Sequence, residues 1–345
     1  MKPLVSILIP AYNAEKWFPE TMESALAQTY PHKEIIIVDD GSKDSTLAVA
    51  RRYESASVKV VSQQNQGAAA ARNKAFSLCQ GDYIQWFDAD DLMSPDKVSS
   101  QMEALEQSEG NKRLLFSCGW GSFLFRLSRA QFRPTPLWDN LKPAEWLVRK
   151  MGQNLFMQTA TWLVSREMTE AAGPWDTQLL GDDDGEYFCR VLLQSESVRF
   201  VPRGEVYYRA AGSTSLSYIG HSEKKLIAQL RSMRLHVSYL RSLEDSERSH
   251  AACAQYLQNW SVFFYPDRMD LFEQIAGMSR EVGGTLKPPA LSWKYRWIRS
   301  LFGWHAAKRA QVLLPRIRWA AARSIDKTLA RFEERKQTSV SPAVS

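Results

Sequence analysis

Three aspartates stand at the exit of an apolar segment. Residues 83–87, Tyr-Ile-Gln-Trp-Phe, have the character of a buried strand, and Asp88, Asp90 and Asp91 follow it directly. Carboxylates this close repel one another and resist desolvation unless positive charge lies among them. A divalent cation such as Mg²⁺ or Mn²⁺ would supply that charge, because hard cations prefer oxygen ligands. The alternative is a solvated acidic loop before a helix that starts at residues 94–96, Ser-Pro-Asp, and the triplet alone does not decide between the two.

A second pair of acids follows a neighbouring strand. Asp39 and Asp40 come directly after the apolar segment 34–38. Strand-like and helix-like segments alternate through the amino-terminal third, which predicts an α/β fold whose mostly parallel sheet has helices on both faces. The carboxyl ends of parallel strands meet at one edge, where ligands bind, and acids there favour a nucleotide site. The predicted strands are residues 4–9, 34–38, 58–62 and 83–87, and the side chains expected together at their edge are Tyr12, Asp39, Asp40, Asp88 and Asp90.

One cation and two absent motifs narrow the kind of nucleotide site. Arg72, in the predicted helix 68–78, can supply the counter-charge for a diphosphate. The sequence has no GxGxxG after its first strand and no GxxxxGK[ST] loop. Dinucleotide-dependent hydride transfer and P-loop chemistry are therefore both disfavoured.

Composition indicates an ordinary globular chain. Its 345 residues are 44% hydrophobic and 24% charged, with a net charge of +6. The four cysteines are far apart and form no CxxC pair, so we expect thiols in a reducing compartment and a cytoplasmic location. We expect no signal peptide, because the first apolar run stops at Pro10, and no segment long enough to span a membrane.

Five short blocks occur in a fixed order between Pro10 and Asp91. Together they resemble the family 2 inverting glycosyltransferases of the GT-A fold, and five blocks in register are far more specific than any one. The resemblance implies a nucleotide-diphosphate sugar donor, most often a UDP-sugar, and Mg²⁺ or Mn²⁺. The blocks are Pro10-x-Tyr12-Asn13, Val38-Asp39-Asp40-Gly41-Ser42-x-Asp44-x-Thr46, Asn65-Gln66-Gly67 with Ala71-Arg72-Asn73, Gly81-Asp82-Tyr83, and Phe87-Asp88-Ala89-Asp90-Asp91.

The resemblance also assigns expected roles to the donor-side residues. Asp90 would hold the metal as the second acid of a DxD motif, with Asp91 a supporting acid. Arg209, the last residue of the predicted strand 206–209, is a candidate contact for the diphosphate. The histidine that many relatives carry after such a Tyr-Arg pair is missing here, which puts any ligand it would supply in doubt. The residues expected to line the nucleotide-sugar pocket are Pro10, Tyr12, Asp39, Asp40, Arg72, Asp88 and Arg209.

A further run of acids, residues 182–184, precedes the helical segment 187–194. Asp183 and Glu186 fit a capping box, which explains two of the acids and does not require the others. Sugar transfer needs a carboxylate that takes a proton from the acceptor hydroxyl. The stretch resembles the family's Glu-Asp-x-Glu-x-x-x-Arg motif, which places the base on Asp184, with Asp183 as the alternative. The resemblance puts Glu186, Arg190 and Trp175 on the acceptor side.

The remainder of the chain predicts a helical extension. We expect a catalytic domain at 1–217, with a nucleotide-sugar half at 1–110 and an acceptor half at 111–217, where residues 158–165 alternate like a strand. Beyond it we expect helices over 218–337 and a disordered tail at 338–345.

Basic residues and aromatics are concentrated near the carboxyl end. Residues 287–335 hold 12 Lys and Arg against 3 acids, interleaved with tryptophans. This composition suits contact with a membrane surface, here the inner face of the cell membrane, or a helical lid packed on the catalytic domain, and both interpretations stay open. Nucleic acid is disfavoured, because the positive charge lies apart from the predicted site.

The sequence therefore predicts a metal-dependent inverting glycosyltransferase that acts on a glycan, lipid-linked or other hydroxyl acceptor. A non-catalytic sugar-nucleotide-binding protein remains an alternative if the acids at 182–184 only start a helix. A nucleotidyltransferase is less favoured, because residues 10–13, Pro-Ala-Tyr-Asn, are not the Gly-rich basic loop that such enzymes need. The sugar, the acceptor, the linkage and the oligomeric state are not fixed by these motifs.

Overall fold

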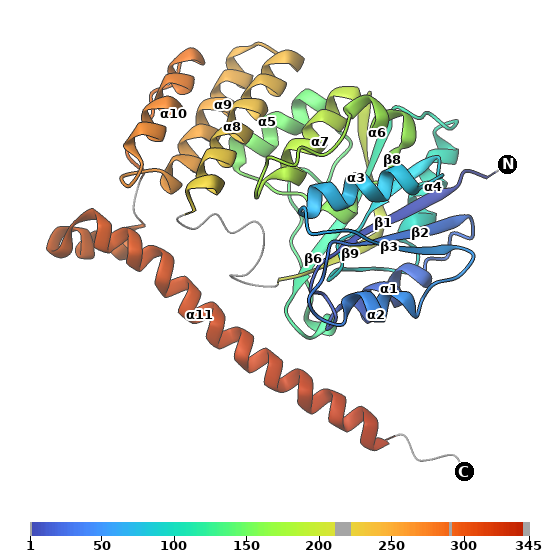
Figure 1. Ribbon diagram of the computed structural model, residues 1–345. Helices are drawn as coiled ribbons and strands as arrows, with labels where there is room; N and C mark the ends of the chain where they lie inside the picture. The colour runs from blue at the N-terminus through green and yellow to red at the C-terminus, as the bar shows by residue number, and fades with distance from the viewer. Residues whose placement is uncertain (1, 211–221, 290–291, 341–345) are drawn as a thin grey trace.

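The central sheet is mostly parallel, as predicted. The computed structural model describes residues 2–210, 222–289 and 292–340 (Figure 1). Its first sheet contains β1 (Val5–Ala11), β2 (Lys33–Asp39), β3 (Val58–Ser62), β4 (Tyr83–Trp86) and β8 (Val164–Ser165). The strand order is β3-β2-β1-β4-β8, and only β8 runs antiparallel to its neighbour. The carboxyl ends of β1, β2 and β4 therefore meet at one edge of the sheet.

Helices cover both faces of this sheet because its strands are apolar on both sides. Ile7 and Ile9 pack with Phe18 on the face covered by α1 (Phe18–Leu26) and α2 (Thr46–Arg51). Leu8 joins the core on the other face, where Ala71 of α3 (Ala68–Leu78) is also buried. Fully buried parallel strands have this continuous apolar character.

A second sheet brings a distant strand under the site. It consists of β5 (Leu92–Met93), β6 (Leu114–Phe123), β7 (Gln131–Phe132) and β9 (Ser197–Arg209), in the order β5-β9-β6-β7. The predicted strand 206–209 is the end of β9, which runs parallel to β6. Because β5 pairs with β9, Leu92 and Met93, which follow Asp91, lie opposite Tyr207 and Val206.

The carboxyl-terminal helices share the core of the catalytic region. α8 (Glu223–Leu243) and α9 (Glu247–Trp260) lie beside α5 (Pro143–Gln153), and α10 (Met269–Glu281) packs on α8 and α9 (Figure 1). Met233 and Leu257 belong to the same buried cluster as Trp162. The predicted boundary at residue 217 stays a prediction, but the packing across it is continuous. The remaining helices are α4 (Lys97–Gln107), α6 (Arg166–Ala172) and α7 (Asp183–Gln194), with short 3₁₀ turns at Leu127–Arg129, Thr159–Thr161, Ser261–Phe263 and Trp293–Tyr295.

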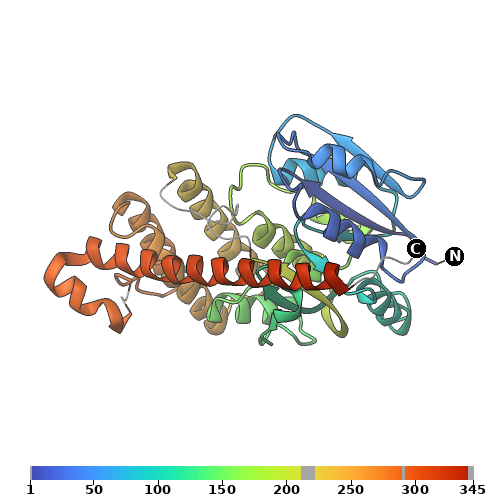
Figure 2. The same ribbon diagram turned by 90° about the horizontal axis from the view of Figure 1, so that it is seen from below.

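A long helix runs across one side of the molecule. α11 (Arg296–Val340) is interrupted at Gly303, which has a φ of 78°, and Figure 2 shows it lying along the underside. Near one end, the Lys308 ammonium lies 2.8 Å from the Asp267 carboxylate. Near the other, the Arg126 guanidinium lies 2.6 Å from Asp326. These contacts hold α11 against two separate parts of the protein.

Two predictions concern residues at or next to the undescribed parts of the chain. α11 continues to Val340, so the helix extends past the predicted start of the disordered tail, and residues 341–345 lie outside the described part. The position after Arg209 where relatives carry a histidine also falls next to the undescribed segment 211–221. Among the described residues, none of the helices combines the length and apolar character needed to cross a membrane.

Candidate functional site

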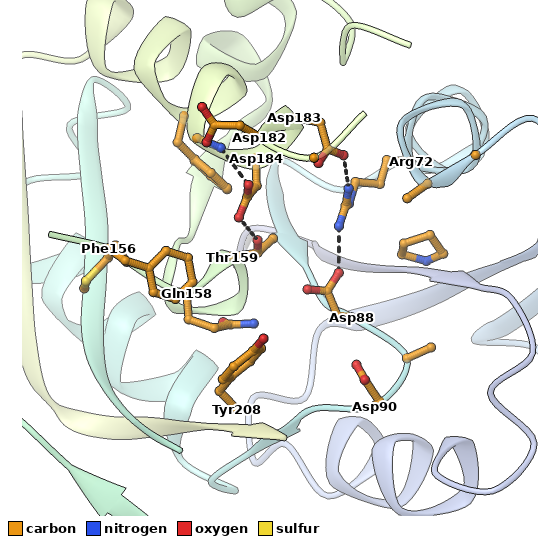
Figure 3. Close-up of a pocket in the computed structure, with 18 of the residues that line it drawn as sticks. Arg72, Asp88, Asp90, Phe156, Gln158, Thr159, Asp182, Asp183, Asp184 and Tyr208 are labelled. Atoms are coloured by element: carbon orange, nitrogen blue, oxygen red, sulfur yellow. Dashed lines mark hydrogen bonds and ion pairs between the residues drawn. The ribbon is translucent and has the colours of Figure 1, made fainter. Parts of the chain in front are cut away.

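A cavity of about 780 Å³ opens at the edge where the strands end (Figure 3). Its wall combines the ends of β1 and β4 with the start of α7 and with parts of α5, α8 and α9. Most of the residues predicted for the site line this one cavity. They are Pro10, Tyr12, Asp40, Arg72, Asp88, Asp90, Asp183, Asp184 and Arg209, whereas Asp39, Asp91, Trp175, Glu186 and Arg190 are not among its lining residues.

The two acids after β4 have different partners. Asp88 accepts from the Arg72 guanidinium at 2.8 Å. Asp90 also lines the cavity, but its carboxylate has no hydrogen bond or ion pair to another described residue. Burial, and then the nearby Asp88 charge, raises the pKa of Asp90 to about 6. Asp90 is therefore the acid with the most to gain from a cation.

Asp91 has a supporting role in the structure. Its side chain is fully buried, and it accepts hydrogen bonds from the Gln158 side-chain amide and, at 2.8 Å, from the backbone N–H of Arg209. Burial and the Asp90 charge raise the pKa of Asp91 well above its ordinary range. The geometry thus makes Asp91 a residue that ties the end of β9 to the Asp90 loop, and direct metal ligation by it stays only a prediction.

The acids after β2 are held by neighbouring loops. Both oxygens of Asp40 accept hydrogen bonds, with distances of 3.0 Å from the N–H of Gln66 and 2.8 Å from that of Gly67. Asp40 therefore shapes the loop that leads into α3. Asp39 is buried and accepts from Ser62, but its Oδ1 has no partner among the described residues. That unpaired oxygen is buried, and Asp39 is not among the residues that line the cavity.

Arg72 links the donor side of the cavity to the acids of α7. Its guanidinium lies 2.8 Å from Asp88 and 2.8 Å from Asp183, and its plane sits 4.4 Å from the centre of the Trp175 ring. The two flanking carboxylates raise the pKa of the Arg72 guanidinium against the effect of its burial. The terminal nitrogens of Arg72 already bind these two carboxylates. Arg72 therefore holds Asp88 and Asp183 in position, in addition to providing positive charge near a ligand.

Asp184 lines the cavity from the first turn of α7. It accepts from the N–H of Gly185 at 2.8 Å and from the Thr159 hydroxyl at 3.4 Å (Figure 3). Burial, followed by the charges of Asp183 and Asp182, raises the pKa of Asp184 to about 7. A carboxylate with this pKa can both accept and release a proton near neutral pH. Asp183 is less suited to that task, because Arg72 already pairs with it.

The start of α7 differs from the predicted capping box. Asp183 is the first helical residue, its side chain pairs with Arg72, and no side-chain capping bond is made at Asp182. Glu186 is buried. Its carboxylate forms an ion pair with Arg190 at 2.8 Å and accepts a hydrogen bond from the Tyr239 hydroxyl at 2.7 Å. The capping-box interpretation was wrong because stronger charged partners compete for these acids.

Trp175 and the Glu186–Arg190 pair support the site from behind. The Trp175 ring is buried and stacks on Tyr187 with 4.0 Å between ring centres. Arg190 donates to the carbonyl of Ala172 as well as to Glu186. Their predicted place on the acceptor side gains no support, since none of them lines the cavity.

Arg209 lies beneath the acidic loop. Its Nε donates to the backbone carbonyl of Asp90 at 2.9 Å, and one Nη lies 2.7 Å from Glu20. The other Nη is buried without a partner among the described residues. The guanidinium also packs 4.2 Å from the Trp17 ring centre. Arg209 therefore combines a fixed position with a spare donor at the cavity wall.

Several cavity residues were missed because no local motif marks them. Tyr208, Phe156 and Gln158 project into the view of the cavity in Figure 3. Burial, and then the Asp91 charge, raises the pKa of Tyr208 above its ordinary value, so its hydroxyl stays a donor. The predicted strand 158–165 was wrong over most of its length, because the Gln158 side chain accepts from Ala160 and starts a 3₁₀ turn. Only Val164–Ser165 is a strand.

The donor set at this edge fits a divalent cation that a ligand helps to bind. Asp90 has an unpartnered carboxylate at the cavity wall, and Asp88 stands beside it. Within residues 2–210, 222–289 and 292–340, no group of three or more acids, histidines or cysteines is arranged to hold a metal alone. Mg²⁺ is commonly bound by one or two carboxylates together with substrate phosphates, and these residues suit that arrangement.

Comparison with known proteins bears on the same segment. Residues 6–170 match the family described as Glycosyl transferase family 2. The chain is 44% identical over 105 residues to a putative teichuronic acid biosynthesis glycosyltransferase of Bacillus subtilis, covering 30% of this chain and 42% of that protein. It is 46% identical over 98 residues to chondroitin synthase of Escherichia coli, covering 28% and 14%. It is 30% identical over 218 residues to the uncharacterized glycosyltransferase EpsJ of B. subtilis, covering 61% and 62%. The chain thus spans less than two thirds of each of these relatives.

Solved structures share the fold at low sequence identity. S. aureus TarS residues 1–349 in complex with UDP-GlcNAc aligns with a TM-score of 0.64 at 17% identity over 81% of each chain. The Pyrobaculum calidifontis mannosyltransferase PcManGT, in complex with GDP-Man and Mn²⁺, aligns with a TM-score of 0.51 at 17% identity over 95% and 88%. The mostly parallel sheet and its helical layers therefore have the GT-A arrangement. Residues 6–170, which include Arg72 and the acids that follow β2 and β4, therefore match glycosyltransferase family 2 in sequence, within a chain that has the GT-A fold.

Proposed function

We propose that the protein is a metal-dependent inverting glycosyltransferase. It would move a sugar from a nucleotide-diphosphate sugar, most simply a UDP-sugar, to a hydroxyl group of a glycan or lipid-linked acceptor. The observation that carries this proposal is that Asp184, with a pKa of about 7, shares one cavity with Asp88 and Asp90. One cavity thus holds a base suited to neutral pH and acids suited to a cation and a diphosphate.

The donor would lie across the ends of β1, β2 and β4. Asp90 and Asp88 would hold the cation, which neutralises the charge of the departing nucleoside diphosphate. The spare Nη of Arg209 supplies fixed positive charge at the same wall. Pro10 and Tyr12 would border the nucleobase, with Asp39 behind them at the end of β2.

The acceptor hydroxyl would meet the donor beside Asp184. Its carboxylate takes the hydroxyl proton as the oxygen attacks the anomeric carbon, and the sugar–phosphate bond breaks on the opposite side. That in-line displacement inverts the configuration at the anomeric carbon. The Gly185 N–H and the Thr159 hydroxyl fix the orientation of the base, while Arg72 keeps Asp183 occupied.

Two relatives suggest the kind of acceptor. Their names refer to teichuronic acid biosynthesis and to chondroitin synthesis, and both products are polysaccharides. An acceptor that is itself a saccharide would suit a cavity of about 780 Å³ with aromatic walls.

The helix α11 would bring the enzyme to a membrane surface. Trp293, Trp297 and Phe302 are exposed by 71%, 59% and 67%, and they stand among the cations of the basic segment 287–335. Exposed rings beside cations suit the interface of an anionic bilayer. The competing lid interpretation has support from the Arg126–Asp326 contact. Sedimentation with anionic and with neutral vesicles distinguishes them, since a lid would bind neither.

The first test is release of nucleoside diphosphate from a panel of UDP-, GDP- and dTDP-sugars. We expect slow hydrolysis of one donor with Mn²⁺ or Mg²⁺ and none with EDTA. Failure of every donor both to turn over and to bind in calorimetry would refute the proposal. Metal-dependent binding without turnover, even with saccharide acceptors, would favour the non-catalytic alternative, in which the acids of residues 182–184 serve only to start α7.

A further inference from the structure

Beyond Asp184 the cavity continues into a chamber between α5, α8 and α9. We call it the inner chamber and define it by the lining residues Trp146, Lys150, Phe188, Gln229, Tyr256 and Trp260. Phe188 lies one helical turn after Asp184 on the same face of α7, so this helix leads from the base to the inner chamber. The match to the family ends at residue 170, before α8 and α9 begin.

The inner chamber contains a cation without an acidic partner. The Lys150 ammonium lies 2.9 Å from Nε2 of His236. Burial, and then the Lys150 charge, lowers the pKa of His236 to about 4, so its imidazole is neutral at pH 7. Nδ1 then donates to the carbonyl of Ser232 at 2.9 Å, and Nε2 accepts from Lys150. Among the described residues Lys150 forms no salt bridge, and a lysine has three N–H donors.

Other groups at this wall also lack acceptors. Gln229 Nε2 and Trp146 Nε1 are buried without a hydrogen-bond partner in the described part of the chain. Buried donors of this kind are normally satisfied, and an oxygen-rich ligand would satisfy them. The opposite end of the cavity carries Asp88 and Asp90, so an anion there would be repelled. Asp182 also lines the cavity, but its carboxylate accepts from the Ser232 hydroxyl and lies 3.8 Å from Nδ1 of His236, so Lys150 is the cation at this end that can meet an anionic group.

We propose that the inner chamber binds a carboxylate or phosphate group on the acceptor, so that the enzyme glycosylates an anionic saccharide. The proposal rests on the proposed function, because it places the reacting hydroxyl at Asp184 and the anionic group at Lys150. The aromatic rings of Trp260 and Tyr256 would pack against the intervening sugar ring. A charged group fixed at one end holds the hydroxyl at the other in position for attack.

The test compares acceptors that differ only in charge. With the donor found by hydrolysis, nucleotide release is measured with methyl glucuronide, methyl glucoside and methyl glucoside 6-phosphate. We expect at least one anionic acceptor to have a KM about tenfold or more below that of the neutral one, because charge-assisted hydrogen bonds favour it. A preference for the glucuronide or for the phosphate identifies the source of the charge.

Variants of Lys150 connect that preference to the inner chamber. In Lys150→Gln we expect the ratio of neutral to anionic KM to fall towards one, and in Lys150→Arg to be largely kept. Lys142→Gln is the matched control, since Lys142 is an exposed lysine at the start of the same helix. Thermal unfolding of each variant checks that the fold is retained. Lys150→Met, which removes the charge but keeps an unbranched side chain, carries the test if the Gln variant does not fold.

The outcomes separate this inference from the proposed function. Wild-type donor hydrolysis with no preference for an anionic acceptor, or with no response to any acceptor, overturns the inference and leaves the proposed function standing. A preference that Lys150→Gln and Lys150→Arg both retain would also overturn it. The absence of both donor hydrolysis and donor binding would instead refute the proposed function itself.

Discussion

The two ends of the cavity are built from different kinds of structure. At the donor end, acids follow strands of the sheet directly, as Asp88 and Asp90 follow β4. At the inner chamber, the wall comes from helices that are distant in sequence, with Lys150 on α5 and Gln229 on α8. The course of the backbone places Asp88 and Asp90 at the edge of the sheet, whereas the packing of distant helices places the ammonium group of Lys150. The donor end can therefore be shared among relatives while the inner chamber changes.

Replacing the base should have the largest effect, because it acts where the two ends meet. In Asp184→Asn we expect sugar transfer to fall by about 10³-fold, since a general base contributes on this scale. Donor binding should persist, because Asp184 makes no contact with Asp88 or Asp90. Steady-state transfer and calorimetry measure the two quantities. Asp139→Asn, at an exposed acid, is the control, and transfer at the parent rate would reassign the base to Asp183.

Replacing the donor-end acid should weaken donor binding alone. For Asp90→Asn we expect the dissociation constant of the donor with Mn²⁺ to rise by about 10²-fold, the upper end of what changes around a metal site cost. With EDTA the parent and the variant should bind the donor equally. Asp82→Asn, at the opposite end of β4, is the control. An equal loss in EDTA would mean that Asp90 contacts the donor without a metal.

The pH dependence tests whether the base is placed as described. Asp184 acts in its deprotonated form, and its pKa is about 7. Well below that pH, kcat should fall about tenfold for each unit of pH, and it should level off above it. Calorimetry of the donor over the same range separates this effect from titration of Asp90. A kcat that stays constant down to about pH 5 would contradict the raised pKa of Asp184.

An aromatic near the entrance to the inner chamber should have the smallest effect. Phe156 is exposed by 44% and lines the cavity beside Trp120 and Tyr208. For Phe156→Ala we expect the acceptor KM to rise about fivefold, the scale of a lost ring contact. The matched control is Phe332→Ala, an exposed ring on α11. A larger rise in the donor KM than in the acceptor KM would move Phe156 to the donor end.

The fold and the donor end could be predicted because their signals are local. The predicted strand 83–87 contains β4, and Asp88 and Asp90, two of the three acids that follow it, line the cavity. Helix 68–78 was predicted with the bounds that α3 has, and it places Arg72. In each case the position of the functional side chain follows from the strand or helix that carries or precedes it, without reference to distant parts of the chain.

The inner chamber could not be predicted because its residues meet only through packing. Nothing near Lys150 in the sequence indicates that His236, on another helix, will lie beside its ammonium. Trp175, which the resemblance puts on the acceptor side, is likewise positioned by tertiary packing, since its ring is buried against Tyr187. The prediction of a strand over residues 158–165 was wrong because the alternation of apolar and polar residues does not reveal that the Gln158 side chain will accept a hydrogen bond from the backbone N–H of Ala160.

The position of Arg72 implies that loading of the donor and release of a proton are thermodynamically coupled. Its guanidinium divides its charge between Asp88 and Asp183, and the pKa of the neighbouring Asp184 rises with the charge on Asp183 and falls with that on Arg72. A divalent cation that binds with the donor would neutralise Asp88. The guanidinium of Arg72 would then interact more strongly with the acids at the start of α7, which would favour the ionised form of Asp184. By reciprocity, the donor should then bind more tightly as pH rises through the titration of the base.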